Sequence, residues 1–272
     1  MSARLLEVAA NSVASALAAQ AGGAGRVELC AALELGGLTP SPACIAMARE
    51  RLRIPLCVLI RPRAGDFLYD DAECEAMLRD IEYCATQGCD GVVLGVLDAD
   101  GGVDVRRCRS LFGAAGNMDV TFHRAFDLAS DPYRALEDVI GLGCARVLTS
   151  GGQANVSEGV PLIRELVRQS AGRLAVMPGA GVTADNLPGL VRSTGASEFH
   201  ASAKRQLASG MRHRPPQLAE MQGGEWRTDV AQVRMLVQAL GRVERGDDDL
   251  QREAWPRSRH EPTSGASMKH GT

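Results

Sequence analysis

Four residues capable of proton transfer lie in or beside short apolar runs of the chain: Glu7, Glu28, His123 and His200. Histidine titrates near neutral pH and a carboxylate can partner it, so these residues are candidate general acids and bases. Two carboxylates and two imidazoles could also hold a hard or borderline divalent metal, although no spacing typical of a zinc site supports this. The alternative is a structural ion-pair network inside the protein.

A second group of residues near the same run ends is suited to binding an anion. Guanidinium groups match phosphate or carboxylate in a fork, and glycine-rich turns can leave backbone N–H groups free. Glycine also serves tight turns, so these turns have a purely structural alternative. The candidate anion-binding and substrate-binding residues are Arg61, Arg63, Asp66, Arg124, Asp127, Ser150, Gly151, Gly179 and Gly181.

Eight short apolar runs position these residues, and most of them lead into a segment with helical periodicity. Such alternation predicts βαβ units and a parallel sheet. Eight units in about 250 residues favour a closed (β/α)₈ TIM barrel, in which the strand ends share one mouth. The alternative is an open α/β sheet. The runs are Leu5–Ala10, Arg26–Cys30, Pro55–Pro62, Gly91–Leu97, Asp119–Ala125, Arg146–Gly151, Leu174–Gly181 and Glu198–Ala203.

Helices are predicted between these runs and after the last one. Their ranges are 13–21, 41–52, 70–87, 103–112, 131–141, 156–169, 184–193 and 229–243. Residues 204–228 do not fit the repeat and are predicted to form a long connection. We expect one barrel domain over residues 1–244. We also expect a disordered tail over residues 245–272, because its polar composition cannot bury enough apolar surface.

Side chains alternate along a strand, so Glu28 shares a face with Cys30, and Cys57 shares one with Arg61. If these faces point into the barrel, buried charges must be partnered. We therefore expect Glu7 and Glu28 to be balanced by Arg61 and a nearby histidine.

The composition narrows the class of protein. The chain has 272 residues, 45% of them hydrophobic, and a net charge of −3. A basic stretch interleaved with aromatic residues is missing, which argues against nucleic-acid binding, and no apolar run is long enough for a membrane helix. Eight cysteines without a Cys-x-x-Cys motif indicate buried thiols in the cytoplasm. Because Lys204 and Lys269 are the only lysines, Schiff-base chemistry is disfavoured.

Several motifs, in order along the chain, resemble the CutC family of copper homeostasis proteins over roughly residues 5 to 243. The resemblance implies a TIM barrel, a cytoplasmic location, homo-oligomers and a role in copper handling. In animal members it implies that cysteines closing the first two strands bind monovalent copper. The matching strings are Arg26–Cys30, Gly36–Ser41, Arg61–Phe67, Thr121–Asp127, Arg146–Gly151 and Glu198–His200.

The copper ligands implied by the resemblance are only partly present. Cys30 occupies the second-strand position, whereas Ala9 occupies the first-strand position. Soft Cu(I) prefers two or three sulfur ligands, so Cys30 alone weakens the case for Cu(I), and Cys57 or Cys44 would have to substitute. Three functions stay open: CutC-type copper homeostasis with Cu(I) as ligand, an enzyme acting on a small anionic or phosphorylated substrate, and a non-catalytic scaffold in an oligomer.

Overall fold

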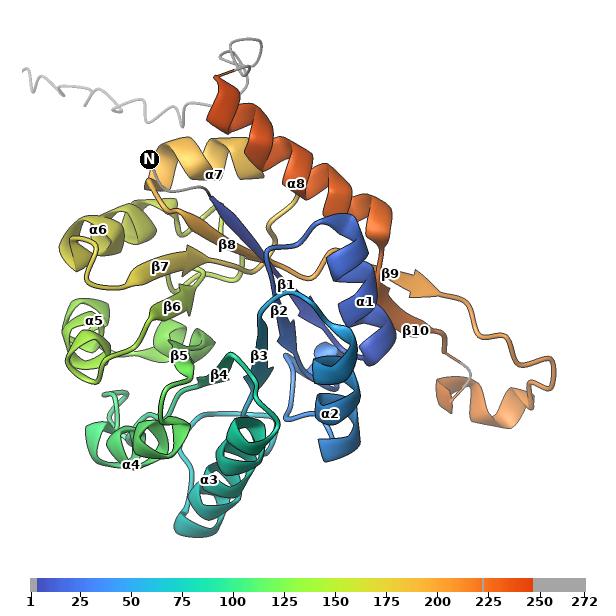
Figure 1. Ribbon diagram of the computed structural model, residues 1–272, viewed down its shortest axis with the longest axis horizontal. Helices are drawn as coiled ribbons and strands as arrows, with labels where there is room; N and C mark the ends of the chain where they lie inside the picture. Colours follow the sequence, from blue (N-terminus) through green and yellow to red (C-terminus); the bar gives the residue numbers. More distant parts are fainter. Residues whose placement is uncertain (1–3, 222, 247–272) are drawn as a thin grey trace, which may run out of the picture.

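The computed structural model describes residues 4–221 and 223–246. In this part of the chain, eight parallel strands form a nearly closed barrel, and helices lie around its outside (Figure 1). The strand order is β7-β6-β5-β4-β3-β2-β1-β8, so consecutive strands are neighbours round the ring. This order confirms the predicted (β/α)₈ TIM barrel and excludes the open sheet.

The barrel strands are short and lie inside the predicted apolar runs. All adjacent pairs except one are joined by parallel ladders; within the described residues no ladder joins β7 to β8, although the two strands are in contact. The ring is therefore loosest at the β7–β8 seam. The strands are β1 (Leu5–Ala10), β2 (Arg26–Leu29), β3 (Leu56–Leu59), β4 (Gly91–Leu94), β5 (Asp119–Phe122), β6 (Arg146–Thr149), β7 (Ala175–Pro178) and β8 (Glu198–Ala201).

Six of the eight helices, all except α6 and α7, begin at side chains that accept hydrogen bonds from the first free backbone N–H groups. Ser12 caps the first helix, and Asp70 and Glu73 form a reciprocal capping box on the third. The helices are α1 (Val13–Gly22), α2 (Pro42–Arg51), α3 (Asp71–Thr86), α4 (Val105–Ala115), α5 (Pro132–Gly141), α6 (Val160–Ser170), α7 (Leu187–Thr194) and α8 (Val230–Arg245). Short 3₁₀ segments are η1 (Leu33–Leu35), η2 (Arg124–Leu128) and η3 (Pro216–Met221).

Two helices begin three or four residues later than the sequence pattern predicts. Helix α6 begins at Val160 rather than Val156, because the Asn155 side chain accepts the N–H of Ser157 and holds this segment in a turn. Helix α7 begins at Leu187 rather than Ala184, because Thr183 and Asn186 exchange side-chain to backbone hydrogen bonds. Local polar side chains therefore compete with the helix at both places.

The predicted long connection over residues 204–228 contains a strand pair that the sequence analysis missed. Strands β9 (Lys204–Leu207) and β10 (Glu225–Thr228) pair antiparallel, and the chain between them projects away from the barrel (Figure 1). Helix α8 then runs to Arg245. The tail predicted over residues 245–272 lies outside the described residues from Asp247 onward, so its disorder stays a prediction.

Candidate active site

A cavity of about 410 Å³ lies at the carboxyl end of the barrel strands. Glu28, Arg61, His123 and His200, which are far apart in the sequence, all line it. Ala9 and Leu59 line it as well, so the alternation along β1, β2 and β3 turns the expected faces into the barrel. Arg124 and Gly181 line it too, so the geometry gathers six of the predicted site residues around one cavity.

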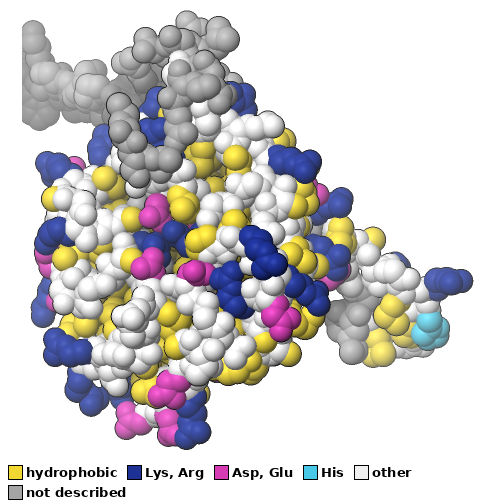
Figure 2. Space-filling view, viewed as in Figure 1, with side chains coloured by type: hydrophobic (Ala, Val, Ile, Leu, Met, Phe, Trp, Pro, Cys, Tyr) yellow, Lys and Arg dark blue, Asp and Glu magenta, His cyan; other side chains and the backbone are white. Residues whose placement is uncertain are grey.

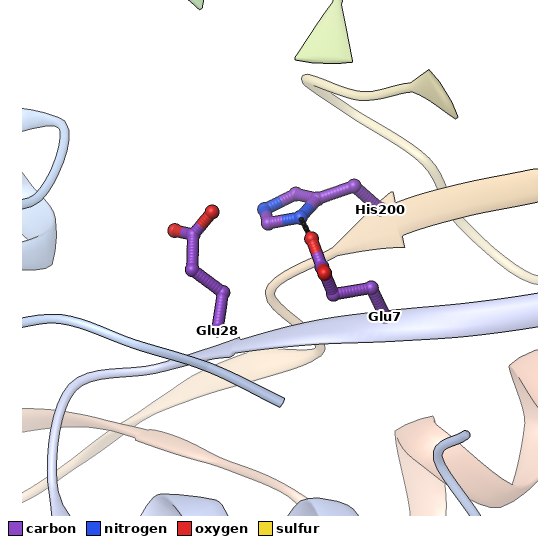
Figure 3. Close-up of side chains that lie close together, drawn as sticks. All are labelled: Glu7, Glu28 and His200. Atoms are coloured by element: carbon purple, nitrogen blue, oxygen red, sulfur yellow. Dashed lines mark hydrogen bonds and ion pairs between the residues drawn. The ribbon is translucent and has the colours of Figure 1, made fainter. Parts of the chain in front are cut away.

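His200 and Glu28 line this cavity, and Glu7, which does not line it, contacts His200 from behind. Figure 3 shows the imidazole of His200 lying between the two carboxylates. The Nδ1 atom of His200 lies 2.8 Å from Oε1 of Glu7. Oε2 of Glu28 is buried and has no hydrogen-bond partner among the described residues. One side of the His200 imidazole is therefore hydrogen-bonded to Glu7, and the other side faces the unpartnered carboxylate of Glu28.

Glu7 is an ionised carboxylate that fixes the tautomer of His200. Burial alone would raise the pKa of Glu7, but the hydrogen bond with His200 and the charge of Arg26 lower this pKa to about 2. An ionised carboxylate only accepts hydrogen bonds, so Nδ1 of His200 donates to Glu7. Burial lowers the pKa of His200, whereas the charge of Glu28 and the bond to Glu7 raise it above its ordinary value.

Glu28 is a carboxyl group held close to its own titration point at neutral pH. Glu28 is only 6% exposed to solvent. Burial raises the pKa of Glu28 to about 7, against the opposing effect of the His200 charge. Both protonation states are therefore accessible near neutral pH, which is what a general acid or base requires.

His123 presents a neutral N–H to the same cavity. Burial lowers the pKa of His123 to about 3, so the ring is neutral at pH 7. The N–H of Ala125 donates to Nδ1 of His123 at 3.2 Å, which leaves the ring proton on Nε2. That Nε2 atom is buried and has no partner within the described part of the chain. His123 is therefore a hydrogen-bond donor that a ligand in the cavity can use.

Gly95, just after β4, creates the space that His123 occupies. A Cβ atom at Gly95 would lie 2.7 Å from Nδ1 of His123, closer than side chains approach. Phe67 packs on the other side, with its ring centroid 4.8 Å from that of His123. The imidazole is thus fixed between a glycine and an aromatic ring, and neither residue was predicted to belong to the site.

Glu7, Glu28 and His200 are also the described group best placed to hold a metal ion. Their ligand atoms lie within 4.8 Å of one another. Both oxygens of Glu7, however, already accept hydrogen bonds, one from His200 and one from Arg26. Glu28 and the outer nitrogen of His200 remain, which is fewer than the three protein ligands common in catalytic metal sites. The arrangement suits proton exchange better than metal coordination.

An ion-pair network runs through the barrel interior beneath the cavity. Arg26 pairs with Glu7 and Glu198, and Arg146 pairs with Glu198 and Asp119. On the face seen in Figure 2, acidic and basic side chains lie next to one another over the barrel. Arg26, rather than the predicted Arg61, therefore balances Glu7. The alternation that pairs Glu28 with Cys30 also places Arg26 on their face, so this partner was detectable from the sequence.

Arg61 lines the cavity, and its two Nη groups bind the loops of the mouth, whereas its buried Nε has no partner among the described residues. Its Nη1 donates to the carbonyl oxygens of Leu35 and Gly37, and its Nη2 donates to that of Gly65. Arg63 and Asp66 do not line the cavity. They pair with each other at 3.0 Å, and Arg63 also pairs with Glu73. The prediction that Arg63 and Asp66 contribute to the site therefore needs correction, because local partners hold both at the surface.

The turn after β6 is also satisfied internally, which corrects the prediction that Ser150 and Gly151 offer free N–H groups. Asp127 accepts the N–H groups of Ser150 and Gly152 and the hydroxyl group of Thr149. The N–H of Gly151 is taken by the Thr149 hydroxyl oxygen. The Asp127 carboxylate therefore takes the place in this turn that a bound anion would occupy.

Arg124 lines the cavity while pairing with the same carboxylate. Its Nε lies 2.7 Å from Asp127, and its Nη2 donates to the hydroxyl oxygen of Ser150. Asp127, Ser150 and Arg124 together form a closed hydrogen-bonded unit between β5 and β6. Asp127 and Ser150 are therefore used within the fold, while Nη1 of Arg124 makes no hydrogen bond with a described residue and the Arg124 side chain is 44% exposed.

The turn after β7 differs, because three of its N–H groups make no hydrogen bond with a described residue. Gly179 donates to the carbonyl oxygen of Thr149. The following residues Ala180, Gly181 and Val182 line the cavity, and their N–H groups donate to no described residue. Ala180 and Gly181 both have left-handed backbone conformations, with φ of 72° and 88°. Of the two predicted glycine-rich turns, only this one can offer backbone donors.

Comparison with known proteins identifies the family. The CutC family model matches residues 4–205. The chain belongs to the CutC family. A family protein CutC from Xanthomonas axonopodis pv. citri is 58% identical over 235 residues, covering 86% of this chain and 98% of the relative.

Two further relatives carry copper homeostasis in their names. The copper homeostasis protein cutC homolog of Mus musculus is 46% identical and covers 85% of this chain and 88% of its own length. The solved structure named for the copper homeostasis protein CutC of Streptococcus agalactiae has a TM-score of 0.71 and 32% identity. It covers 73% of this chain and 98% of its own chain. The resemblance found in the sequence motifs is therefore confirmed.

Six of the eight cysteines of this CutC protein are buried thiols, whereas Cys44 and Cys74 are partly exposed. Cys30 and Cys57 belong to one small cluster of buried residues, together with Leu59 and Val93. Burial raises the pKa of both thiols above its ordinary value, which keeps them protonated. All eight cysteines are free, and none joins the described group of three possible metal ligands. None of the described helices is long and apolar enough to cross a membrane.

Proposed function

We propose that this CutC-family protein is an enzyme whose cavity moves a proton to or from a small anionic substrate. The observation that carries the proposal is the unpartnered, buried carboxylate of Glu28 facing an imidazole that Glu7 holds in place. A buried polar group without a hydrogen-bond partner costs about 1 to 3 kcal/mol of folding stability. Such a group calls for an explanation, and we infer that a ligand is its partner.

The cavity residues divide the chemistry among them. Glu28 exchanges the proton, since its pKa of about 7 lets it act in either direction. His123 donates its Nε2–H to a substrate oxygen on which negative charge develops, as preorganised donors do in other active sites. His200, when protonated, stabilises the ionised form of the neighbouring Glu28. Glu7 and Arg26 orient His200 without contacting the substrate.

Proton transfer can be tested without knowing the substrate. The protein is incubated in D₂O with a panel of phosphorylated sugars and small carboxylic acids, and deuterium incorporation is followed by mass spectrometry. We expect at least one compound to gain deuterium with wild type and not with Glu28→Gln. The matched control is Asp66→Asn, which alters an exposed acid outside the cavity. Exchange that persists in Glu28→Gln would contradict the role of Glu28.

Cu(I) binding is the second candidate function. It is supported by the names of the relatives and by the presence of Cys30 and Cys57 in one cluster. The donor set fits Cu(I) only partly, because thiolates bind the ion and burial keeps both thiols protonated.

Copper binding is tested by titration with Cu(I) under anaerobic conditions in competition with a chromophoric chelator. If the protein handles copper at this cluster, Cys30→Ser and Cys57→Ser should each abolish stoichiometric binding. Cys144→Ser is the control, because Cys144 is another buried thiol outside the cluster. Equal binding by all three variants would exclude a site at Cys30.

A further inference from the structure

The cations that line the cavity differ in whether their donors are already used. Arg61 serves the carbonyl oxygens of three loop residues, and Arg124 is paired with Asp127. Lys204 also lines the cavity, but its ammonium group makes no hydrogen bond or ion pair with any described residue. Lys204 is therefore the described side-chain cation of the cavity whose hydrogen-bond donors are all unused.

Strand β10 keeps Lys204 at the mouth. Nζ of Lys204 lies 4.9 Å from the centre of the Trp226 ring, a cation–π contact that fixes the side chain without neutralising it. The Trp226 carbonyl oxygen accepts from the Asn11 side chain at 2.8 Å, just after β1. The N–H of Thr228 donates to the Ser15 hydroxyl group of α1. The strand pair β9–β10 is thus anchored to the barrel and positions a charge.

Lys204 shares the cavity with the unbonded N–H groups of residues 180–182. Both flank the loose seam between β7 and β8, since the turn follows β7 and Lys204 lies three residues after β8. Backbone donors beside a lysine form a site for a group with several charged oxygens. The buried, unpartnered atoms of Glu28 and His123 lie in the same cavity and independently indicate that a ligand completes it.

We propose that Lys204 and the N–H groups of Ala180, Gly181 and Val182 bind the phosphate group of a phosphate monoester. This proposal rests on the proposed enzymatic function and assigns the anionic end of its substrate. A phosphate monoester has three terminal oxygens and up to two negative charges, whereas a carboxylate has two oxygens and one charge, so phosphate is the better match for an ammonium group and several backbone donors together. Trp226 is a positioning residue that acts through Lys204.

Calorimetric titration with inorganic phosphate at constant ionic strength tests the subsite. We expect Lys204→Gln to weaken binding at least about tenfold, the loss expected for a charge-assisted hydrogen bond. The matched control is Arg205→Gln, which removes the same charge from the next residue. Arg205 is exposed and pairs with Asp229 rather than lining the cavity. Equal losses in the two variants, or no loss in Lys204→Gln, would overturn the proposal.

Three further comparisons sharpen the test. Trp226→Ala should weaken phosphate binding by about threefold, within the range for an exposed cation–π contact, and Trp226→Phe should restore most of it. Acetate binding as tight as that of phosphate would overturn the assignment to a phosphate group. Glu28→Gln should keep the phosphate affinity while losing deuterium exchange, so failure of the subsite and failure of the proton-transfer function give different results.

Discussion

The β5–β6 side of the barrel mouth and the side formed by β1, β2 and β8 both carry buried carboxylates, but they treat them differently. Asp127 accepts hydrogen bonds from backbone, hydroxyl and guanidinium groups. Glu28 keeps an oxygen without any described partner. A satisfied carboxylate stabilises the fold, whereas an unsatisfied one is available for chemistry. Burial of a carboxylate at the barrel mouth therefore does not indicate function by itself. The hydrogen-bond partners of that carboxylate must be considered as well.

Removing Asp127 should have the largest effect. Asp127→Ala leaves the N–H groups of Ser150 and Gly152 and the Thr149 hydroxyl group without their acceptor, and we expect a loss of about 3 to 5 kcal/mol in the free energy of unfolding. Urea denaturation measures it. Asp66→Ala is the control and should change stability by less than about 0.5 kcal/mol, because Asp66 is exposed. A small loss in Asp127→Ala would show that the turn is not held by this carboxylate.

Replacing Glu28 with an uncharged residue should raise the free energy of unfolding, and the size of this gain should depend on pH. The pKa of Glu28 is raised from 4.5 to about 7 by folding, so ionising it costs the folded state stability as pH rises through this interval. Glu28→Gln removes that cost. We expect the variant to match wild type below pH 4.5 and to exceed it by up to about 3 kcal/mol above pH 7. A variant less stable than wild type at pH 8 would mean that Glu28 has partners.

Filling the space at Gly95 should have the smallest of the three effects. Gly95→Ala pushes a methyl group against His123, and we expect a loss of about 1 to 3 kcal/mol together with slower deuterium exchange. The control is Gly113→Ala in α4, where an added Cβ meets nothing within 4 Å. It should be neutral or slightly stabilising. Unchanged exchange in Gly95→Ala would remove His123 from the proposed chemistry.

The strand runs and helix patterns were sufficient to predict the barrel, because hydrophobic periodicity and turn residues are local signals. The gathering of Glu28, Arg61, His123 and His200 followed from that topology alone. Arg26, the partner of Glu7, was also detectable, because it shares a strand face with Glu28. The contacts of Asp127 and Lys204 were not, because each joins two separate segments of the chain. In particular, the sequence does not show whether a carboxylate of the protein, such as Asp127, accepts the N–H groups of a glycine-rich turn. The cytoplasmic location and the homo-oligomer stay predictions.

The state of Glu28 is the most direct test of the whole account. Carbon-13 NMR of the glutamate side-chain carboxyl groups, assigned by loss of one signal in Glu28→Gln, gives its pKa in the folded protein. We predict a titration near pH 7, in agreement with a buried carboxyl group that faces His200 and lacks a partner. A titration near or below the ordinary value of 4.5 would show a paired structural carboxylate and contradict the proposed active site.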